Sequence, residues 1–222
     1  AAKFNLLINY LAEHSKFLSI TVFSMSIQPA TPQHAQPASV LIRQSGPATF
    51  DYIFDANHGP DNLCFLRHEF RNPGTMFSYR HHFVYLENDQ VVGTLAMFDK
   101  SSHNKTFLAN ALAIFQNYGW RSIVKGLKFE LKLVMAPKKG CLYISHIAVD
   151  DRYQGKGIAR QLIQYATEQG IKQGYSRLSL DVAAKNQRAK GLYLGLDFKV
   201  LTTHTSYHAR LDDHIYMEKA LG

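Results

Sequence analysis

Apolar residues along this chain follow two spacings, and the changes between them predict an alternation of strands and helices. Short apolar runs bounded by turn residues are typical of buried strands, whereas apolar positions three and four apart are typical of helices packed on a sheet. Strands are predicted at 39–45, 141–149, 177–182, 198–203 and 214–219. Helices are predicted at about 50–70 with a break, at 156–172 and at 186–194. The pattern indicates a mixed α/β domain.

A long helical pattern interrupts this alternation before the strand at 141–149. Two further strands flank Asn88-Asp89, a pair that is typical of a hairpin turn. Apolar positions over 104–137 then recur at helical spacing. We therefore predict an inserted helix pair between the hairpin and the next strand. Its aromatic residues form either core or a lid over a neighbouring site.

The first 38 residues have a pattern of their own. Apolar positions at helical spacing predict a short amphipathic helix, the stretch 17–27 is typical of a strand, and three prolines between 29 and 37 predict a linker. These features divide the chain into an N-terminal extension over 1–38 and a main domain over 39–222. A signal peptide is disfavoured because the apolar run begins deep in the chain and Glu13 stands where positive charge belongs.

Composition narrows the class of protein. The 222 residues are 46% hydrophobic and 12% aromatic, which is typical of a globular domain with a sizeable core. A net charge of +8 favours anionic partners. Because the basic residues are scattered, charge alone does not choose among nucleic acid, a membrane surface and a phosphorylated cofactor. No apolar run is long enough to span a bilayer, and we expect neither a membrane nor nucleic acid as partner. Cys64 and Cys141 have no ligand or disulfide spacing, which favours a reduced cytoplasmic setting.

The stretch RYQGKGIAR at 152–160 places Gly155 and Gly157 among basic residues at the start of a predicted helix. Apolar residues from Ile158 onward form one face, so the helix begins at the glycines and its first amides point at the preceding loop. These amides carry partial positive charge, and the absence of Cβ atoms lets a phosphate approach. The segment predicts an anion site, with a plain glycine turn as the alternative.

Two common phosphate motifs fit this stretch poorly. A Walker loop needs GxxxxGK followed by a hydroxyl residue, and neither the spacing nor the hydroxyl is present. A dinucleotide fingerprint needs GxGxxG, and Arg160 stands at the third position. Asp181 does lie about 20 residues further on, where a ribose-binding acid would stand. The dinucleotide interpretation is therefore the weaker one.

A third interpretation is supported by two motifs, one on each side of the strand predicted at 177–182. RYQGKGIA has Arg152, Gly155 and Gly157 in the register of R/Q-x-x-G-x-G/A, and the segment resembles the GNAT N-acetyltransferase superfamily. A second family signature, N-x-x-A-x-x-L-Y-x-x-x-G-F, is similar to NQRAKGLYLGLDF at 186–198. Asp197 departs from it where the family usually has glycine. The resemblance covers about 39–220 and is strongest over 141–200.

The resemblance implies an acyl-CoA N-acyltransferase fold, with the helical insertion and the N-terminal extension added to it. In that fold the strands at 141–149 and 177–182 part to admit acetyl-CoA as co-substrate. Backbone amides from 154 to 159 would hold its pyrophosphate, and the strand edge at 147–149 would pair with its pantetheine. The implied cofactor-binding residues are Ile147, Ala148, Val149, Arg152, Gln154, Gly155, Lys156, Gly157, Ile158, Ala159, Asn186 and Tyr193.

The implied reaction is direct transfer of an acetyl group to an amine. It needs a donor for the oxyanion and a proton for the departing thiolate. The resemblance gives the backbone N–H of Ile147 as the oxyanion donor and Tyr193 as the general acid. A phenol with a pKa of about 10 is protonated at neutral pH. The alternative for Tyr193 is a core aromatic.

The sequence assigns no general base. Strand alternation places Tyr143 and Ser145 on the substrate-facing side of 141–149, and His146 on the other side as a structural histidine. Glu69 and the histidines at 81 and 82 lie in segments that border the acceptor site. The histidines and aspartates between 204 and 214 lack zinc spacing, so no metal is expected, and we interpret them as a surface loop or, second, as substrate contacts.

Two classes of function fit these observations. The first is an acetyl-CoA-dependent N-acetyltransferase acting on a small-molecule or protein amine, with a homodimer as a possible assembly. The second is a non-catalytic acyl-CoA-binding regulatory module on the same fold. Tyr193 favours the enzyme, and the lack of an assigned base keeps the module open.

Overall fold

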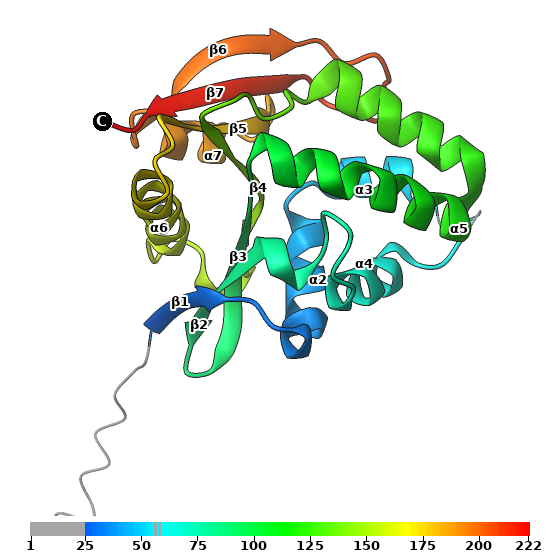
Figure 1. The fold of residues 1–222 in the computed structure, drawn as a ribbon, viewed down its shortest axis with the longest axis horizontal. Helices are drawn as coiled ribbons and strands as arrows, with labels where there is room; N and C mark the ends of the chain where they lie inside the picture. The colour runs from blue at the N-terminus through cyan, green and yellow to red at the C-terminus, as the bar shows by residue number, and fades with distance from the viewer. Residues whose placement is uncertain (1–24, 56, 58) are drawn as a thin grey trace, which may run out of the picture.

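The computed structural model describes residues 25–55, 57 and 59–222, and within them seven strands form one mixed sheet (Figure 1). The strands lie in the order β1-β2-β3-β4-β5-β7-β6. Neighbours are antiparallel except for β4 and β5, which are parallel. The strands are β1 (Met25–Pro29), β2 (His82–Glu87), β3 (Gln90–Phe98), β4 (Cys141–Val149), β5 (Arg177–Ala183), β6 (Lys199–His204) and β7 (His214–Ala220).

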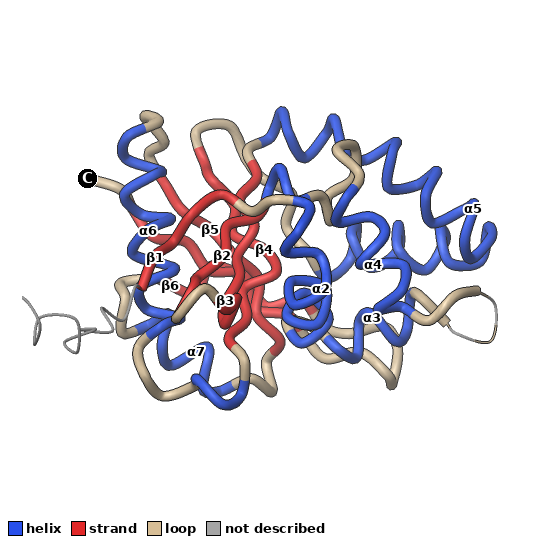
Figure 2. Tube along the Cα trace, turned by 90° about the horizontal axis from the view of Figure 1, so that it is seen from below, coloured by secondary structure: helices blue, strands red, loops and turns tan. Residues whose placement is uncertain are grey.

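Helices cover both faces of the sheet, with α6 and α7 on one face and α2 to α5 on the other (Figures 1 and 2). Each face has its own apolar core. No helix in the described part of the chain is long and apolar enough to cross a membrane. The helices are α2 (Ala35–Gln44), α3 (Pro47–Ile53), α4 (Asn62–Arg71), α5 (Lys100–Leu133), α6 (Ile158–Lys172) and α7 (Gln187–Leu194).

The hairpin and the inserted helix pair are confirmed. Asn88 and Asp89 have φ of 53° and 61°, the left-handed conformation of a two-residue turn between β2 and β3. The insertion is α5, which Gly119 divides into two arms because its φ of 74° and ψ of −176° are not helical. A glycine adopts this conformation at little steric cost. The mixed α/β class is confirmed with it.

The strand predicted at 39–45 is wrong, because these residues belong to α2. Ala38, Leu41 and Ile42 are buried and lie three and four residues apart, whereas Val40 is exposed. An apolar run of this length fits either a buried strand or one face of a short helix, and packing against α4 and the sheet decides for the helix. Pro37 is compatible with it because it lies in the first turn.

The predicted linker before residue 39 also differs from the structure. Residues 25–29 form β1, the edge strand that pairs antiparallel with β2, and Pro29 is its last residue. An edge strand tolerates proline, which cannot donate a ladder hydrogen bond. The sheet therefore includes residues that the sequence assigned to an extension. The amphipathic helix predicted near the start, and most of the strand predicted at 17–27, lie outside the described residues.

Strands β4 and β5 separate along their length. They pair only from Cys141–Tyr143 with Arg177–Ser179, although both continue beyond that point. The second halves of the two strands therefore have no ladder hydrogen bonds between them. This opening in the centre of the sheet positions the site described next.

Candidate functional site

The N-terminus of α6 forms a cradle of backbone amides. Gly155 and Gly157 both have a φ of 82°, and a Cβ built on either would meet no atom within 4 Å. Gly157 is the N-cap of α6, and no side chain caps the first turn. The first amides of the helix therefore remain available to an anion, with the partial positive charge of a 15-residue helix behind them. This open, positively polarised loop fits a pyrophosphate.

Side chains around the cradle fix the shape of the loop. Arg152 pairs with Asp150 at 2.8 Å, which lowers the pKa of that carboxyl. Gln154 donates to the carbonyl of Val149 at 3.2 Å and accepts from Arg188 at 2.5 Å. Lys156 lies 3.8 Å from Glu87 and covers the ring of Tyr153. The loop is thus tied to β4, to the hairpin and to α7.

The remaining predicted cofactor residues are spread over three elements. Ala148 and Val149 pair with β3, so their edge of β4 toward β5 has no ladder partner. Ile158 is the first residue of α6 and is buried, and Ala159 follows it in the first turn. Asn186 caps α7 by accepting from the N–H of Ala189 at 3.1 Å. The structure therefore brings the predicted segments to one end of the opening in the sheet.

Strand β4 contains a bulge that changes which side chains face the opening. The pairing register with β3 shifts between Thr94 and Ala96, and His146 has a φ of 49°. A bulge inserts an extra residue and breaks the alternation of side chains. Tyr143, Ser145 and His146 consequently all line one cavity. The prediction that parity turns His146 away from the site is therefore wrong.

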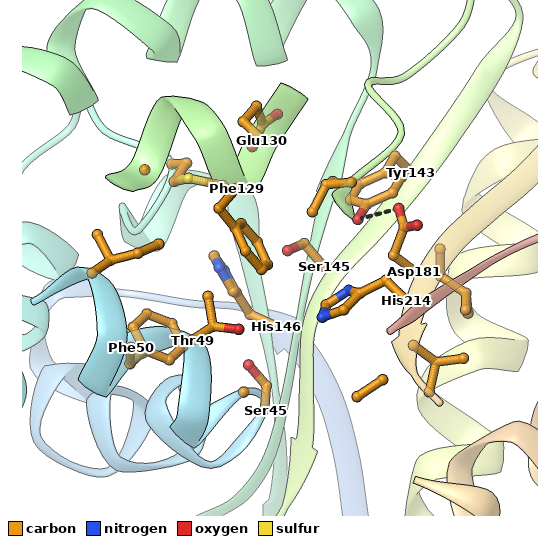
Figure 3. A pocket seen from close by; sticks show the side chains of 18 of the residues that line it. Ser45, Thr49, Phe50, Phe129, Glu130, Tyr143, Ser145, His146, Asp181 and His214 are labelled. Atoms are coloured by element: carbon orange, nitrogen blue, oxygen red, sulfur yellow. Dashed lines mark hydrogen bonds between the residues drawn. The ribbon is translucent and has the colours of Figure 1, made fainter. Parts of the chain in front are cut away.

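One cavity of about 570 Å³ extends from the opening between β4 and β5 into the helical layer (Figure 3). Its sheet end is formed by β4, β5 and α7, and includes the predicted residues Ile147, Asn186 and Tyr193. Its other end lies among α3 and both arms of α5. The glycine loop of the cradle is not part of the lining. The site thus has two connected parts, joined by β4.

Asp181 on β5, which the sequence suggested only as a ribose-binding acid in the weaker dinucleotide interpretation, lines this cavity. Its Oδ2 accepts from the hydroxyl of Tyr143 at 3.1 Å (Figure 3) and from the backbone N–H of Met135, also at 3.1 Å. Its Oδ1 is buried and has no hydrogen-bond partner among the described residues. Burial raises the pKa of Asp181 to about 7, although the two hydrogen bonds oppose this shift. An aspartate inside the apolar strand LSLDVAA was the signal available in the sequence.

Two tyrosines border the same cavity and are protonated at neutral pH. Tyr193 is 5% exposed and packs against Phe198, with the ring centroids 5.8 Å apart. Burial raises the pKa of Tyr193 well above its usual value. The pKa of Tyr143 is also raised, first by burial and then by the neighbouring Asp181. Both phenols therefore keep their protons, and that of Tyr143 is already donated to Asp181.

His146 is held in one tautomer by a second histidine. Nδ1 of His82 lies 2.8 Å from the carbonyl of Ser78, which can only accept, so Nδ1 carries the proton. Nε2 of His82 then accepts from Nδ1 of His146 at 3.2 Å, with the rings parallel within 2°. Burial lowers the pKa of His82 to about 4 and that of His146 well below its usual value. His146 is thus neutral, with the lone pair of Nε2 free.

The other polar residues considered from the sequence lie in different places. Glu69 is buried in α4, where burial raises its pKa, and His81 lies against Phe98; neither lines the cavity. His214 does line it and packs edge-on against Phe129. In the part of the chain that the structure describes, no group of three or more histidine, cysteine, aspartate or glutamate residues could hold a metal ion.

Comparison with known proteins agrees with this geometry. The sequence model of the acetyltransferase (GNAT) family matches residues 48–198. Ribosomal protein bS18-alanine N-acetyltransferase from Escherichia coli K12 is 30% identical over 108 residues, which are 49% of this chain and 71% of that protein. The family match includes the glycine cradle at 155–157.

Solved structures show the same fold at low sequence identity. An N-acetyltransferase from Staphylococcus aureus Mu50 superposes with a TM-score of 0.65 at 19% identity, over 87% of this chain and 99% of that one. A structure of yncA from Salmonella typhimurium with its cofactor acetyl-CoA has a TM-score of 0.53 at 14% identity, over 89% and 94% of the two chains. These likenesses concern the fold alone.

Proposed function

This chain belongs to the acetyltransferase (GNAT) family, and on that premise we propose that Asp181 is the base for a direct acetyl transfer to a primary amine. The protein is an N-acetyltransferase, and acetyl-CoA is its co-substrate. The observation that carries the proposal is Oδ1 of Asp181, which has no hydrogen-bond partner in the described part of the chain and is buried in the cavity that Tyr193 and the β4 bulge also line.

The α6 cradle would hold the pyrophosphate of acetyl-CoA through backbone amides. Gly155 and Gly157 leave the space for it, and Arg152 and Lys156 add positive charge beside it. The free edge of β4 at 147–149 would pair with the pantetheine amides. Acetyl-CoA supplies an activated acetyl thioester, and its reactive end would lie in the opening between β4 and β5.

Backbone and phenol donors at the sheet end would stabilise the charges of the reaction. Ile147 lies in the bulge, outside the ladder register with β3, so its N–H is suited to the developing oxyanion. Tyr193 would donate its proton to the departing thiolate, because burial keeps the phenol protonated. Both groups border one cavity, so they can act on the same carbon centre.

Asp181 would take the proton from the incoming amine. A base works best when its pKa lies near the working pH, and burial brings the pKa of Asp181 to about 7. Tyr143 and the N–H of Met135 hold Oδ2, which leaves Oδ1 to receive the amine. Nε2 of His146 would accept a second N–H and orient the nitrogen.

Several narrower statements remain proposals. The acceptor is a small-molecule or protein amine. Cysteine usage favours a cytoplasmic location, and a homodimer stays a prediction. We take residues 25–222 as the acetyltransferase domain, since β1 belongs to its sheet.

Thiol release from acetyl-CoA across a panel of amines tests the proposal, with calorimetry of CoA binding run in parallel. We expect at least one amine to raise thiol release well above background, with an equal amount of acetylated amine formed. Tight CoA binding without acceleration by any amine would instead indicate the non-catalytic module.

A further inference from the structure

We infer that the acceptor is a primary amine on an apolar, non-peptidic body, and that the helical half of the cavity binds this body. The inference rests on the proposed function and specifies its substrate class. It follows from what lines the far end of the cavity, from which polar groups there are already engaged, and from the charges of the lining.

The helical half of the cavity is lined mainly by apolar side chains. Phe50 and Ile53 come from α3, and Ile114, Ile123 and Phe129 come from the two arms of α5. The whole cavity of about 570 Å³ lies within the range of small-molecule sites. An acetyl group with a short polar amine would leave most of the helical half unfilled. Burial of an apolar body there is favourable in proportion to the area removed from water.

Most polar side chains in this half already bind one another or the backbone. Nε2 of His103 lies 2.7 Å from Oε1 of Glu130, and Oδ1 of Asn110 accepts from the N–H of Met76 at 2.8 Å. Thr106 donates to the carbonyl of His103 at 3.0 Å. The helices that form the walls satisfy their own backbone groups. A peptide acceptor, which needs successive hydrogen bonds for its backbone, would find few partners here.

The charged residues of the lining also favour an apolar ligand with a single amine. Lys185 is the one lysine or arginine that lines the cavity in the described part of the chain, and Asp212 engages it at 2.5 Å. No free cation therefore stands ready to bind the carboxylate of an amino acid. Oδ1 of Asp181 has no hydrogen-bond partner among the described residues and can accept one amine. The lining thus matches a ligand with a single amine at one end.

The apolar lining continues to the surface along the first arm of α5. Phe107 lines the cavity and is also 46% exposed. Leu108 and Leu112 are exposed on the same arm but do not line the cavity. An apolar ligand could pass along these side chains while its amine leads toward Asp181.

Steady-state kinetics with straight-chain alkylamines from ethylamine to octylamine tests the inference. We expect kcat/KM to rise by about 4-fold per added methylene until the helical half is filled, which is the usual gain for a buried CH₂. Phenethylamine should be accepted well. Free lysine and a tetrapeptide with an N-terminal alanine should be poor acceptors.

Three variants in α5 locate the effect. Ala111→Phe fills the lining, so kcat/KM for hexylamine should fall at least about 10-fold while that for ethylamine stays within about 2-fold. Gln116→Phe adds the same ring at an exposed position outside the lining and should change neither value. Leu127→Ala removes an apolar contact and should lower kcat/KM for hexylamine as well. Unchanged CoA affinity establishes that each variant is folded.

Calorimetry of hexylamine and octylamine binding to the CoA-bound protein distinguishes a failure of the proposed function from a failure of this inference. If no amine is acetylated, the proposed function fails. The inference would still be supported if the affinity for the alkylamine increases with chain length and is lost in Ala111→Phe. If amines are acetylated but kcat/KM is flat with chain length, the inference is overturned. Preference for the tetrapeptide would overturn it too and identify a protein acceptor.

Discussion

Burial gives Asp181 properties that its residue type does not have in water. A solvated aspartate is a weak base at neutral pH, but loss of solvation raises its pKa to about 7. Tyr143 and Met135 hold one carboxyl oxygen and leave the other free. At the scale of single residues, the site therefore depends on one group whose surroundings adjust both its pKa and its geometry.

Asp181→Asn should lower kcat/KM by about 10²-fold above pH 8 and remove an inflection near pH 7 from the pH profile. The unprotonated form is the active one, so the wild-type rate rises with pH through about 7. Asparagine keeps an acceptor for Met135 and Tyr143. The matched variant Glu130→Gln changes a second carboxyl of the cavity lining and should retain the inflection. If Glu130→Gln loses the inflection and Asp181→Asn keeps it, the assignment is wrong.

The same shift predicts a change of stability with pH. The folded-state pKa of Asp181 lies above its unfolded value, so its contribution to stability falls as pH rises from about 4 to about 7 and is constant above that. We expect Asp181→Asn to be more stable than the wild type at pH 8 and closer to it at pH 4. Thermal unfolding at both pH values would measure this, and an equal difference at both would contradict it.

Tyr193→Phe should lower kcat by about 10²-fold and leave acetyl-CoA affinity unchanged. The ring, which packs on Phe198, is retained, and only the proton donor is lost. Tyr85→Phe is a suitable control because Tyr85 is also buried but its hydroxyl donates to Gln161, outside the cavity. Near-normal kcat in Tyr193→Phe would leave thiolate protonation to water.

Among the elements, α6 forms the anion cradle with its N-terminus, and its C-terminus takes no part in the cradle. Gly157 precedes the helix and Gly174 follows it, and both have left-handed φ with open space where a Cβ would stand. The two glycines thus have a similar conformation but lie at opposite ends of the helix dipole. This makes them a matched pair for a substitution test.

Gly157→Asp should abolish CoA binding, because it places a carboxylate against the expected pyrophosphate. Gly174→Asp introduces the same side chain with similar backbone strain and should bind CoA as the wild type does. Calorimetry with CoA measures both. Equal affinity in the two folded variants would mean that the loop before α6 is only a turn.

At the scale of the whole molecule, the sheet separates two apolar cores and opens between β4 and β5 to join them. The cofactor cradle lies on the α6 side, and the proposed acceptor chamber lies among α3 and α5. Strand β1 closes the opposite edge of the sheet through β2. Its loss would leave β2 unpaired on one side and would remove Ile27, which packs on the core.

Two shortened chains test this role of β1. A chain starting at Met25 keeps every described element, so we expect it to bind CoA with wild-type affinity. A chain starting at Ala30 lacks β1 and should unfold at least about 3 °C lower than the first, the shift that roughly 1 kcal/mol produces in a domain of this size. Loss of CoA binding in the first, while it stays folded, would assign residues 1–24 to the site.

Local sequence determined the features that depend on residues close together in the chain. The glycine motif indicated the α6 cradle, Asn88-Asp89 placed the hairpin turn, and helical spacing predicted the insertion that Gly119 divides. Each rests on local backbone preference or periodicity. The short apolar run at 39–45 lacked such a preference, and α2 forms there because packing on the sheet favours a helix.

Tertiary structure decided the features that depend on residues far apart. The β4 bulge turns His146 into the cavity, and His82, 64 residues earlier, fixes its tautomer. Asp181 gains its raised pKa only because β5, β4 and the segment after α5 meet around it. Strand alternation cannot predict a bulge, and burial of one carboxyl depends on the whole packing. The sequence therefore determined the family and the cradle, whereas folding determined the candidate base and the shape of the acceptor chamber.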